Sequence, residues 1–182
     1  VELFDATFFE MWTDNEIKFN TANKQYKESD YEKLIEFNKN DVFESLQKKI
    51  NHFQPDIIFW SAVSSHIHGE GEYVNIQYGY DLVSKIKTDS LLITGGIQAT
   101  ANPEKILREF KNINYLIRGE SEFVLKEVAN SLRNNKEIKK IDGIVFEDEN
   151  KKIVINKRQE IISNMDLIPN YDYSLFKEQI FL

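Results

Sequence analysis

Three stretches of the sequence combine glycine with small polar residues, and each one follows a short apolar run. They are "SSHIHGEGE" from residue 64, "TGGIQATAN" from residue 94 and "RGESE" from residue 118. Hydroxyl groups bind polar ligand groups, and glycine lets a ligand approach main-chain N–H groups closely. The other loops are rich in lysine, asparagine and glutamate. These three stretches are therefore the candidates for a binding site.

The glycine pair Gly95-Gly96 has two interpretations. Glycine admits positive φ and the close approach of a ligand, but a glycine pair is also ordinary turn chemistry. The pair belongs neither to the phosphate loop G-x-x-x-x-G-K-[ST] nor to G-x-G-x-x-G. Hydrolysis of a nucleoside triphosphate is therefore disfavoured, and the pair alone leaves both a turn and a ligand seat open.

The other two stretches carry charged or metal-ligating side chains. His66 and His68 stand two residues apart with Glu70 beyond them, a pattern that could bind a metal. Without a partner cluster elsewhere, ordinary loop residues are the simpler interpretation. The run Arg118-Gly119-Glu120 either pairs internally and caps the next helix, where a carboxylate is favoured, or faces a ligand.

An alternating series of strands and helices positions these stretches. "IIFWSAV", "SLLITGG" and "INYLIRGE" are near-continuous apolar runs, as parallel strands covered on both faces require. Amphipathic helices are predicted around residues 41–53, 73–87 and 121–134, with Asp41 and Ser121 as N-caps, and another helix is predicted to start at Asn102 and Pro103. This alternation indicates right-handed βαβ units and a parallel sheet. Ligands of such sheets bind beyond the carboxyl ends of the strands, where the three stretches lie.

The two ends of the chain follow a different pattern. Val1 to Phe8 is predicted as a strand, and residues 10–40 as an irregular connection with one helix near 31–37. "GIVFEDENKKIVIN" predicts a β-hairpin. "EIISNMDLIPNYDYSLF" predicts an extended arm without a core of its own.

Bulk composition narrows the function classes. The chain has 182 residues, a formal net charge of −7 and no cysteine. Its acidic balance argues against nucleic-acid binding, and no apolar run is long enough for a membrane span. Disulfides, thiolate metal sites and cysteine nucleophiles are excluded within this chain. The expected location is cytoplasmic.

Five segments in the same order resemble a known domain. "PDIIFWSAVSS", "LLITGGIQAT", "NYLIRGESE", "IDGIVFEDENKKIVIN" and "MDLIPNYDYSLF" resemble the cobalamin-binding domain of cobalamin-dependent radical S-adenosylmethionine enzymes. This group includes the anaerobic magnesium-protoporphyrin monomethyl ester cyclase. The resemblance implies an α/β, flavodoxin-like, doubly wound parallel sheet over residues 1–135, with its first strand missing. The hairpin (136–160) and the arm (161–182) would follow.

The resemblance also implies a set of cobalamin contacts. Ser61 and Ser64 match the serine-bearing loop that meets the nucleotide tail, and the glycine pair matches the double glycine beside that tail. The matching third loop is Arg-Gly-Glu. The predicted cofactor-binding residues are Ser61, Ser64, Ser65, His66, Thr94, Gly95, Gly96, Arg118, Gly119 and Glu120. No catalytic residue and no metal ligand is predicted, and the motif Asp-x-His-x-x-Gly that supplies an axial histidine elsewhere does not occur.

The family's three-cysteine motif, which binds an iron-sulfur cluster and S-adenosylmethionine, is absent from this sequence. We therefore expect a piece of a longer protein whose C-terminal radical domain is its partner. The parent would perform methyl transfer or oxidative cyclisation on a hydrophobic or tetrapyrrole-like substrate. A degenerate structural domain of the same fold is the alternative. A receiver-like signalling domain is disfavoured, since the first buried strand ends in serine rather than a phospho-accepting aspartate. Exposed sheet edges could let the chain pair with a copy of itself.

Overall fold

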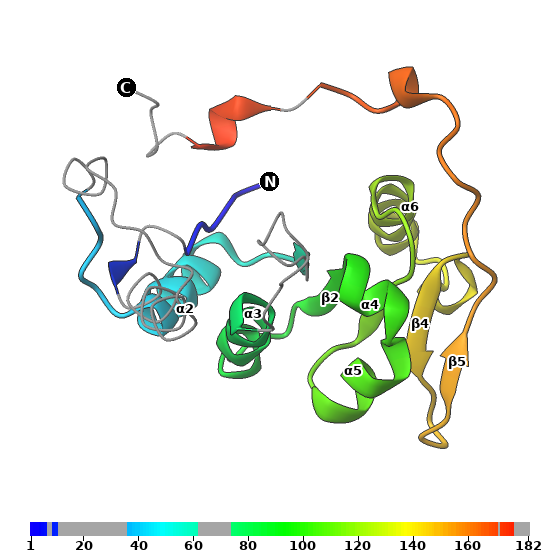
Figure 1. Cartoon of the computed structure of the whole chain (residues 1–182), viewed down its shortest axis with the longest axis horizontal. Helices are drawn as coiled ribbons and strands as arrows, with labels where there is room; N and C mark the ends of the chain where they lie inside the picture. The colour runs from blue at the N-terminus through cyan, green and yellow to red at the C-terminus, as the bar shows by residue number, and fades with distance from the viewer. Residues whose placement is uncertain (7–8, 11–35, 62–73, 171, 177–182) are drawn as a thin grey trace, which may run out of the picture. The chain divides into compact units, whose positions relative to one another are not determined.

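The chain divides into two compact units in the computed structural model (Figure 1). The model describes residues 1–6, 9–10, 36–61, 74–170 and 172–176. The smaller unit comprises Val1–Gln54, Lys85–Thr88 and Tyr171–Leu182. The larger unit comprises Pro55–Ser84 and Asp89–Asn170.

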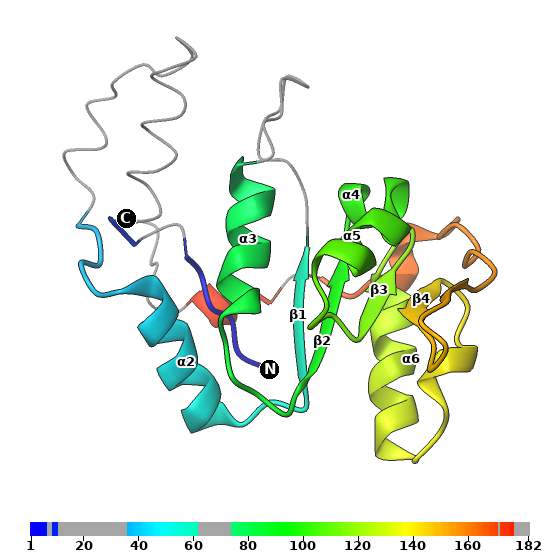
Figure 2. The same cartoon turned by 90° about the horizontal axis from the view of Figure 1, so that it is seen from below.

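The larger unit is built on a five-stranded sheet in the order β1-β2-β3-β4-β5. The strands β1 to β3 are parallel, and Figure 2 shows β1 and β2 side by side. The strands β4 and β5 form the predicted hairpin and extend the same sheet in antiparallel pairing. Their bounds are Ile57–Ser61, Leu91–Gly95, Tyr115–Ile117, Ile144–Glu147 and Ile153–Ile155.

Helices cover both faces of this sheet, so the expected α/β, flavodoxin-like arrangement is confirmed. On one face α3 (Val74–Ser84), α4 (Ile97–Ala101) and α5 (Pro103–Glu109) pack against Leu116 and Val145. On the other, α6 (Glu122–Arg133) and the short helix η2 (Ile138–Lys140) pack against Ile117 and Ile144. Figure 1 shows α5 and α6 on opposite sides of the sheet. Burial on both faces explains why the strands lack alternating polarity.

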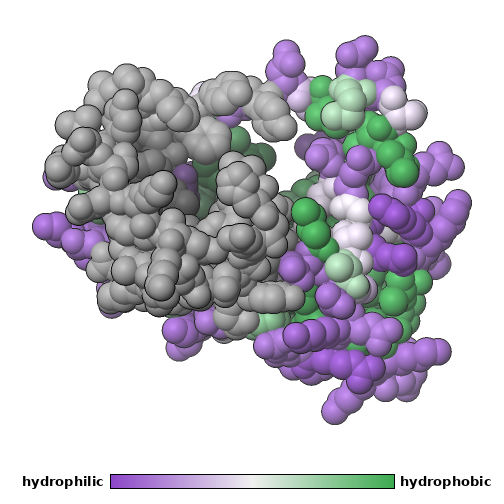
Figure 3. Space-filling model, in the orientation of Figure 1, coloured by the Kyte–Doolittle hydropathy of each residue, from purple (hydrophilic) through white to green (hydrophobic). Residues whose placement is uncertain are grey.

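An arm follows the hairpin and carries exposed apolar side chains. It contains the short helix η3 (Met165–Leu167). Ile161, Met165 and Leu167 keep 72%, 67% and 64% of their surface exposed. Figure 3 shows apolar residues among polar ones on the visible face of the described part of the chain. The prediction of an extended segment with no core of its own therefore holds for these residues.

The smaller unit contains α2 (Val42–Phe53) and the short helix η4 (Tyr173–Phe176). The predicted cap is confirmed, because a carboxylate oxygen of Asp41 accepts the Glu44 N–H at 2.9 Å. No helix in the described ranges is long and apolar enough to cross a membrane.

The predicted strand from Val1 to Phe8 is wrong over residues 1–6, which form none. This segment makes side-chain contacts and no strand hydrogen-bond pairing. Glu2 pairs with Lys49 at 3.1 Å, and the Phe4 and Phe9 ring centroids lie 5.5 Å apart. The only strand-like pairing described nearby is an isolated bridge between Phe9 and Asn38. β-prone composition alone does not make a strand without a partner edge. Of the helix predicted near 31–37, residues 36–37 are not helical and the others lie outside the described ranges.

Two details at the helix ends also differ from the sequence prediction. The stretch "TGGIQATAN" is predicted as a loop, but its residues Ile97–Ala101 form the helix α4. Five residues are too few to show a helical period in the sequence. Ser121 does not cap α6: its backbone is already helical and its hydroxyl makes no cap hydrogen bond. That hydroxyl lies elsewhere, over the end of β2.

Candidate functional site

The carboxyl ends of the parallel strands bring the predicted loops to one edge of the sheet. Ser61 ends β1 and Gly95 ends β2, and these two residues are register partners. The loop Arg118-Gly119-Glu120 follows β3, the next strand along. Ser61 is exposed at this edge. Ser64, Ser65 and His66 lie in residues 62–73, outside the described ranges.

The glycine pair is required by the fold itself. A Cβ on Gly95 would lie 2.6 Å from Ser121 Oγ and 3.3 Å from the Phe59 ring. A side chain at position 95 would therefore force the Ser121 hydroxyl to rotate away and the Phe59 ring to shift, whether or not a ligand is present. Gly96 has φ of +97°, a conformation that side chains rarely adopt. The pair is thus explained by close packing and by backbone geometry.

Beneath this edge, Thr94 belongs to the interior of the larger unit. It is fully buried, and its hydroxyl donates to the Trp60 carbonyl oxygen at 3.1 Å. Burial raises the pKa of the neighbouring Tyr80, while the Thr94 hydroxyl opposes the shift and Glu109 adds to it. Thr94 therefore supports the site by joining β2 to β1.

The loop after β3 is joined to three other elements. The Arg118 N–H donates to the Gly143 carbonyl at 2.8 Å, and the Gly119 N–H donates to Thr100 Oγ1 at 2.9 Å. Glu120 Oε2 accepts the N–H of Ile162 at 2.7 Å. The carboxylate of Glu120 thus holds the arm beside the carboxyl edge.

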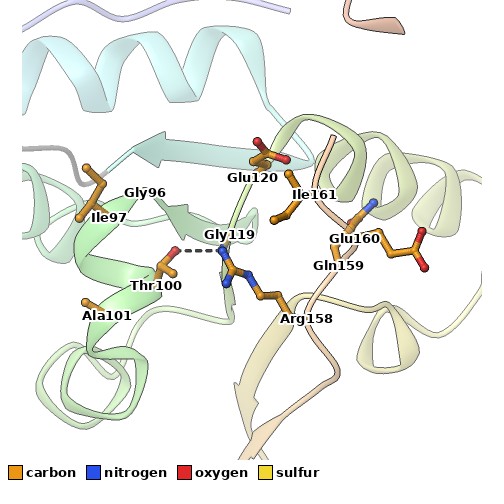
Figure 4. A pocket seen from close by; sticks show the side chains of 10 residues that line it. All are labelled: Gly96, Ile97, Thr100, Ala101, Gly119, Glu120, Arg158, Gln159, Glu160 and Ile161. Carbon is orange, nitrogen blue, oxygen red and sulfur yellow. Dashed lines mark hydrogen bonds between the residues drawn. The ribbon is translucent and has the colours of Figure 1, made fainter. Parts of the chain in front are cut away.

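A hollow of about 470 Å³ lies at this edge, between the β2–α4 turn, the β3–α6 loop and the arm (Figure 4). Its most exposed apolar members are Ile97 and Ile161, at 67% and 72% exposure. Three predicted site residues line it: Gly96, Gly119 and Glu120. Ser61, Thr94, Gly95 and Arg118 do not. The full lining is Gly96, Ile97, Thr100, Ala101, Gly119, Glu120, Arg158, Gln159, Glu160 and Ile161.

The residues from Arg158 to Ile161 were not predicted to contribute to the site. The predicted hairpin nevertheless indicates where these residues must lie. Each antiparallel step reverses the chain, so two steps make β5 run in the same direction as β3. The segment that follows β5 must then emerge at the carboxyl edge, beside the three predicted loops.

Metal ligation finds no support in the described part of the chain. There, no three histidine, aspartate or glutamate side chains lie close enough together to hold an ion. The predicted His-x-His-x-Glu run lies outside the described ranges.

Two curated relatives match about three quarters of this chain. An uncharacterized methyltransferase of Pyrococcus horikoshii is 30% identical over 134 residues, which are 74% of this chain and 28% of the relative. The anaerobic magnesium-protoporphyrin IX monomethyl ester cyclase of Cereibacter sphaeroides is 27% identical over 145 residues, covering 76% and 22%. The chain thus spans about a quarter of the length of these relatives. No family model matches it.

Solved structures share the fold at low sequence identity. One is the radical S-adenosylmethionine methyltransferase TsrM of Kitasatospora setae with cobalamin and a [4Fe-4S] cluster bound. It has a TM-score of 0.54 and 16% identity, over 74% of this chain and 24% of that one. The apo form of the cobalamin-dependent radical enzyme OxsB gives 0.53 and 18%, over 75% and 18%. The resemblance to cobalamin-dependent radical enzymes that the sequence suggested is confirmed.

Proposed function

We propose that this chain is a cobalamin-binding module of a radical S-adenosylmethionine enzyme. The observation that carries the proposal is the hollow at the carboxyl edge, in a fold shared with enzymes that include a cobalamin-bound structure. Parallel α/β sheets bind ligands at this edge. The curated relatives, a methyltransferase and a tetrapyrrole cyclase, support the same class.

The residues at the edge fit a large, partly apolar ring. Ile97 and Ile161 offer exposed apolar surface at the hollow, and Gly96 leaves the backbone bare there. In the proposal the corrin ring rests against these three residues. Bound cobalamin would supply a cobalt centre able to carry a methyl group.

The remaining predicted contacts belong to the proposal in different roles. Ser61 would contact the ligand from the end of β1, and Ser64, Ser65 and His66 would follow it. Gly95, Thr94 and Arg118 would act by keeping β1, β2 and β4 in place. Glu120 would act by holding the arm.

The activity of a longer parent is part of the same proposal. The parent would perform methyl transfer or oxidative cyclisation in the cytoplasm. S-adenosylmethionine and an iron-sulfur cluster would be held by a radical domain, for which this cysteine-free chain supplies no thiolate. This part of the proposal is supported by the two curated relatives and by the structural neighbour TsrM.

A purely structural domain is the second candidate, because close packing alone accounts for the glycine at position 95. The contacts of Gly95 with Ser121 and Phe59 favour a glycine even when no ligand is present. The glycine pair alone therefore does not distinguish a binding domain from a degenerate one, and the test must use other residues.

Titration with hydroxocobalamin, followed by the change in its absorbance spectrum, tests the proposal. Ile97→Glu places a charge in the hollow, whereas Met165→Glu changes an equally exposed apolar residue that does not line it. We expect binding by the wild type and by Met165→Glu, and a loss of about tenfold or more for Ile97→Glu. A wild type that leaves the spectrum unchanged would favour the structural domain.

A further inference from the structure

The segment Arg158–Ile161, here called the strap, is fixed at both of its ends. Before it, the Gly143 N–H donates to the Lys157 carbonyl at 2.7 Å. After it, the Ile162 N–H donates to Glu120 at 2.7 Å. All four strap residues line the hollow. The strap is therefore a positioned wall of the hollow.

Arg158 is the strap residue directed at the β3–α6 loop. A Cβ on Gly119 would lie 3.6 Å from Arg158 Nε, so the side chain lies against the bare backbone of that glycine. Figure 4 shows the guanidinium pointing toward Thr100 and Gly119. Because Gly119 has no side chain, there is room for the arginine side chain beside it.

Arg158 is also the one cationic residue in the lining of the hollow. Among the described residues, no carboxylate forms an ion pair with it. Glu120, an acidic neighbour in the same lining, is bonded to Ile162. A guanidinium has five N–H donors and no acceptor, so its complement is a group of acceptor oxygens such as those of a carboxylate or a phosphate.

We propose that Arg158 binds the phosphodiester of the ligand's nucleotide tail, which makes the strap a ligand-binding element. This inference rests on the proposed function, because cobalamin supplies the phosphodiester. Cobalamin also carries amide carbonyls on the corrin ring, which offer neutral acceptor oxygens. Cobinamide separates these two possibilities, because it keeps the ring amides and lacks the phosphodiester.

The experiment compares cobalamin and cobinamide binding by the wild type, Arg158→Met and Lys157→Met. Methionine keeps an unbranched apolar stem and removes the charge. Lys157 is the neighbouring exposed cation and does not line the hollow. We expect Arg158→Met to weaken cobalamin binding on the order of tenfold to a hundredfold. Its cobinamide affinity, and both affinities of Lys157→Met, should stay within about twofold of the wild type.

Each alternative outcome has a distinct meaning. Equal weakening of both ligands by Arg158→Met, or no weakening of either, overturns the assignment to phosphate while the proposed function stands. A wild type that binds neither corrinoid overturns the proposed function together with this inference. Arg158→Lys, which keeps the charge and loses the planar fork, should fall between wild type and methionine. An unchanged urea midpoint for each variant shows that the fold is retained.

Discussion

Gly95 shows at the scale of single residues that a bare backbone can be needed by the fold alone. The space that its Cβ would fill is occupied by the Ser121 hydroxyl and the Phe59 ring. A bulky residue at position 95 would therefore disturb the core before it could report on a ligand. Binding is better tested at exposed residues of the hollow.

Gly95→Ala should lower the free energy of unfolding by about 1–3 kcal/mol, because the added methyl overpacks the end of β2. Gly79→Ala is the matched control, since its Cβ would meet nothing closer than Trp60 Cδ1 at 3.8 Å. That change in a helix should stabilise by roughly 0.5–1 kcal/mol. Urea denaturation measures both.

Removing the Ser121 hydroxyl should relieve part of this strain. We expect the double variant Gly95→Ala with Ser121→Ala to be more stable than Gly95→Ala alone. If Ser121→Ala brings no recovery, the steric explanation for Gly95 is wrong.

Tyr80 should make stability fall at high pH. Burial raises its pKa above the ordinary value of 10.0, so the folded state favours the protonated phenol. The stabilisation is present below pH 10 and is lost as the pH rises through the raised pKa. Tyr80→Phe should lose less unfolding free energy between about pH 9 and about pH 11 than the wild type. Identical slopes for the two proteins would contradict this assignment.

The hairpin determines, at the scale of elements, which segments meet at the site. Because β4 and β5 are both antiparallel to their preceding neighbours, the chain returns to the carboxyl edge after β5. The residues after it form the strap. An appendage in sequence thus becomes a wall of the hollow in the structure.

The main elements were predictable because burial on two faces leaves a clear pattern. The runs at Ile57–Ser61 and Leu91–Gly95 and the Asp41 cap follow directly from residue types. The predicted strand at Val1–Phe8 is wrong over residues 1–6, because strand formation also requires a neighbouring strand with which to pair. The role of Ser121 depends on a contact with Gly95 across the fold. The place of Arg158 depends on the direction of the chain after the hairpin, which brings it to the carboxyl edge.

Glu120→Ala should release the arm from the carboxyl edge. The variant removes the acceptor for the Ile162 N–H, so that amide should exchange its hydrogen about tenfold faster or more. Glu120→Gln keeps an acceptor oxygen and should change the rate less. Hydrogen exchange followed at the Ile162 amide measures the effect.

Glu122→Ala is the control, as an exposed acidic residue in the first turn of α6. It should leave exchange at Ile162 unchanged. Equal rates in Glu120→Ala and the wild type would show that this hydrogen bond does not hold the arm.

At the scale of the whole molecule, the chain is a small part of the proteins it resembles. It spans 28% and 22% of the two curated relatives. Its larger unit places a hollow where α/β sheets bind ligands, and the hollow is lined from three separate segments. The proposed role is to hold the cofactor for chemistry completed by another part of the parent.

The most direct test is to locate bound cobalamin on this chain by nuclear magnetic resonance. Cob(II)alamin is paramagnetic and broadens the signals of amides near the cobalt, whereas hydroxocobalamin does not. Binding at the hollow predicts strong broadening at Gly96, Gly119 and Ile161, and little at Asp56, which precedes β1 at the opposite edge of the sheet. Broadening centred near Asp56, or none at saturating cob(II)alamin, would contradict a cobalamin site at the carboxyl edge.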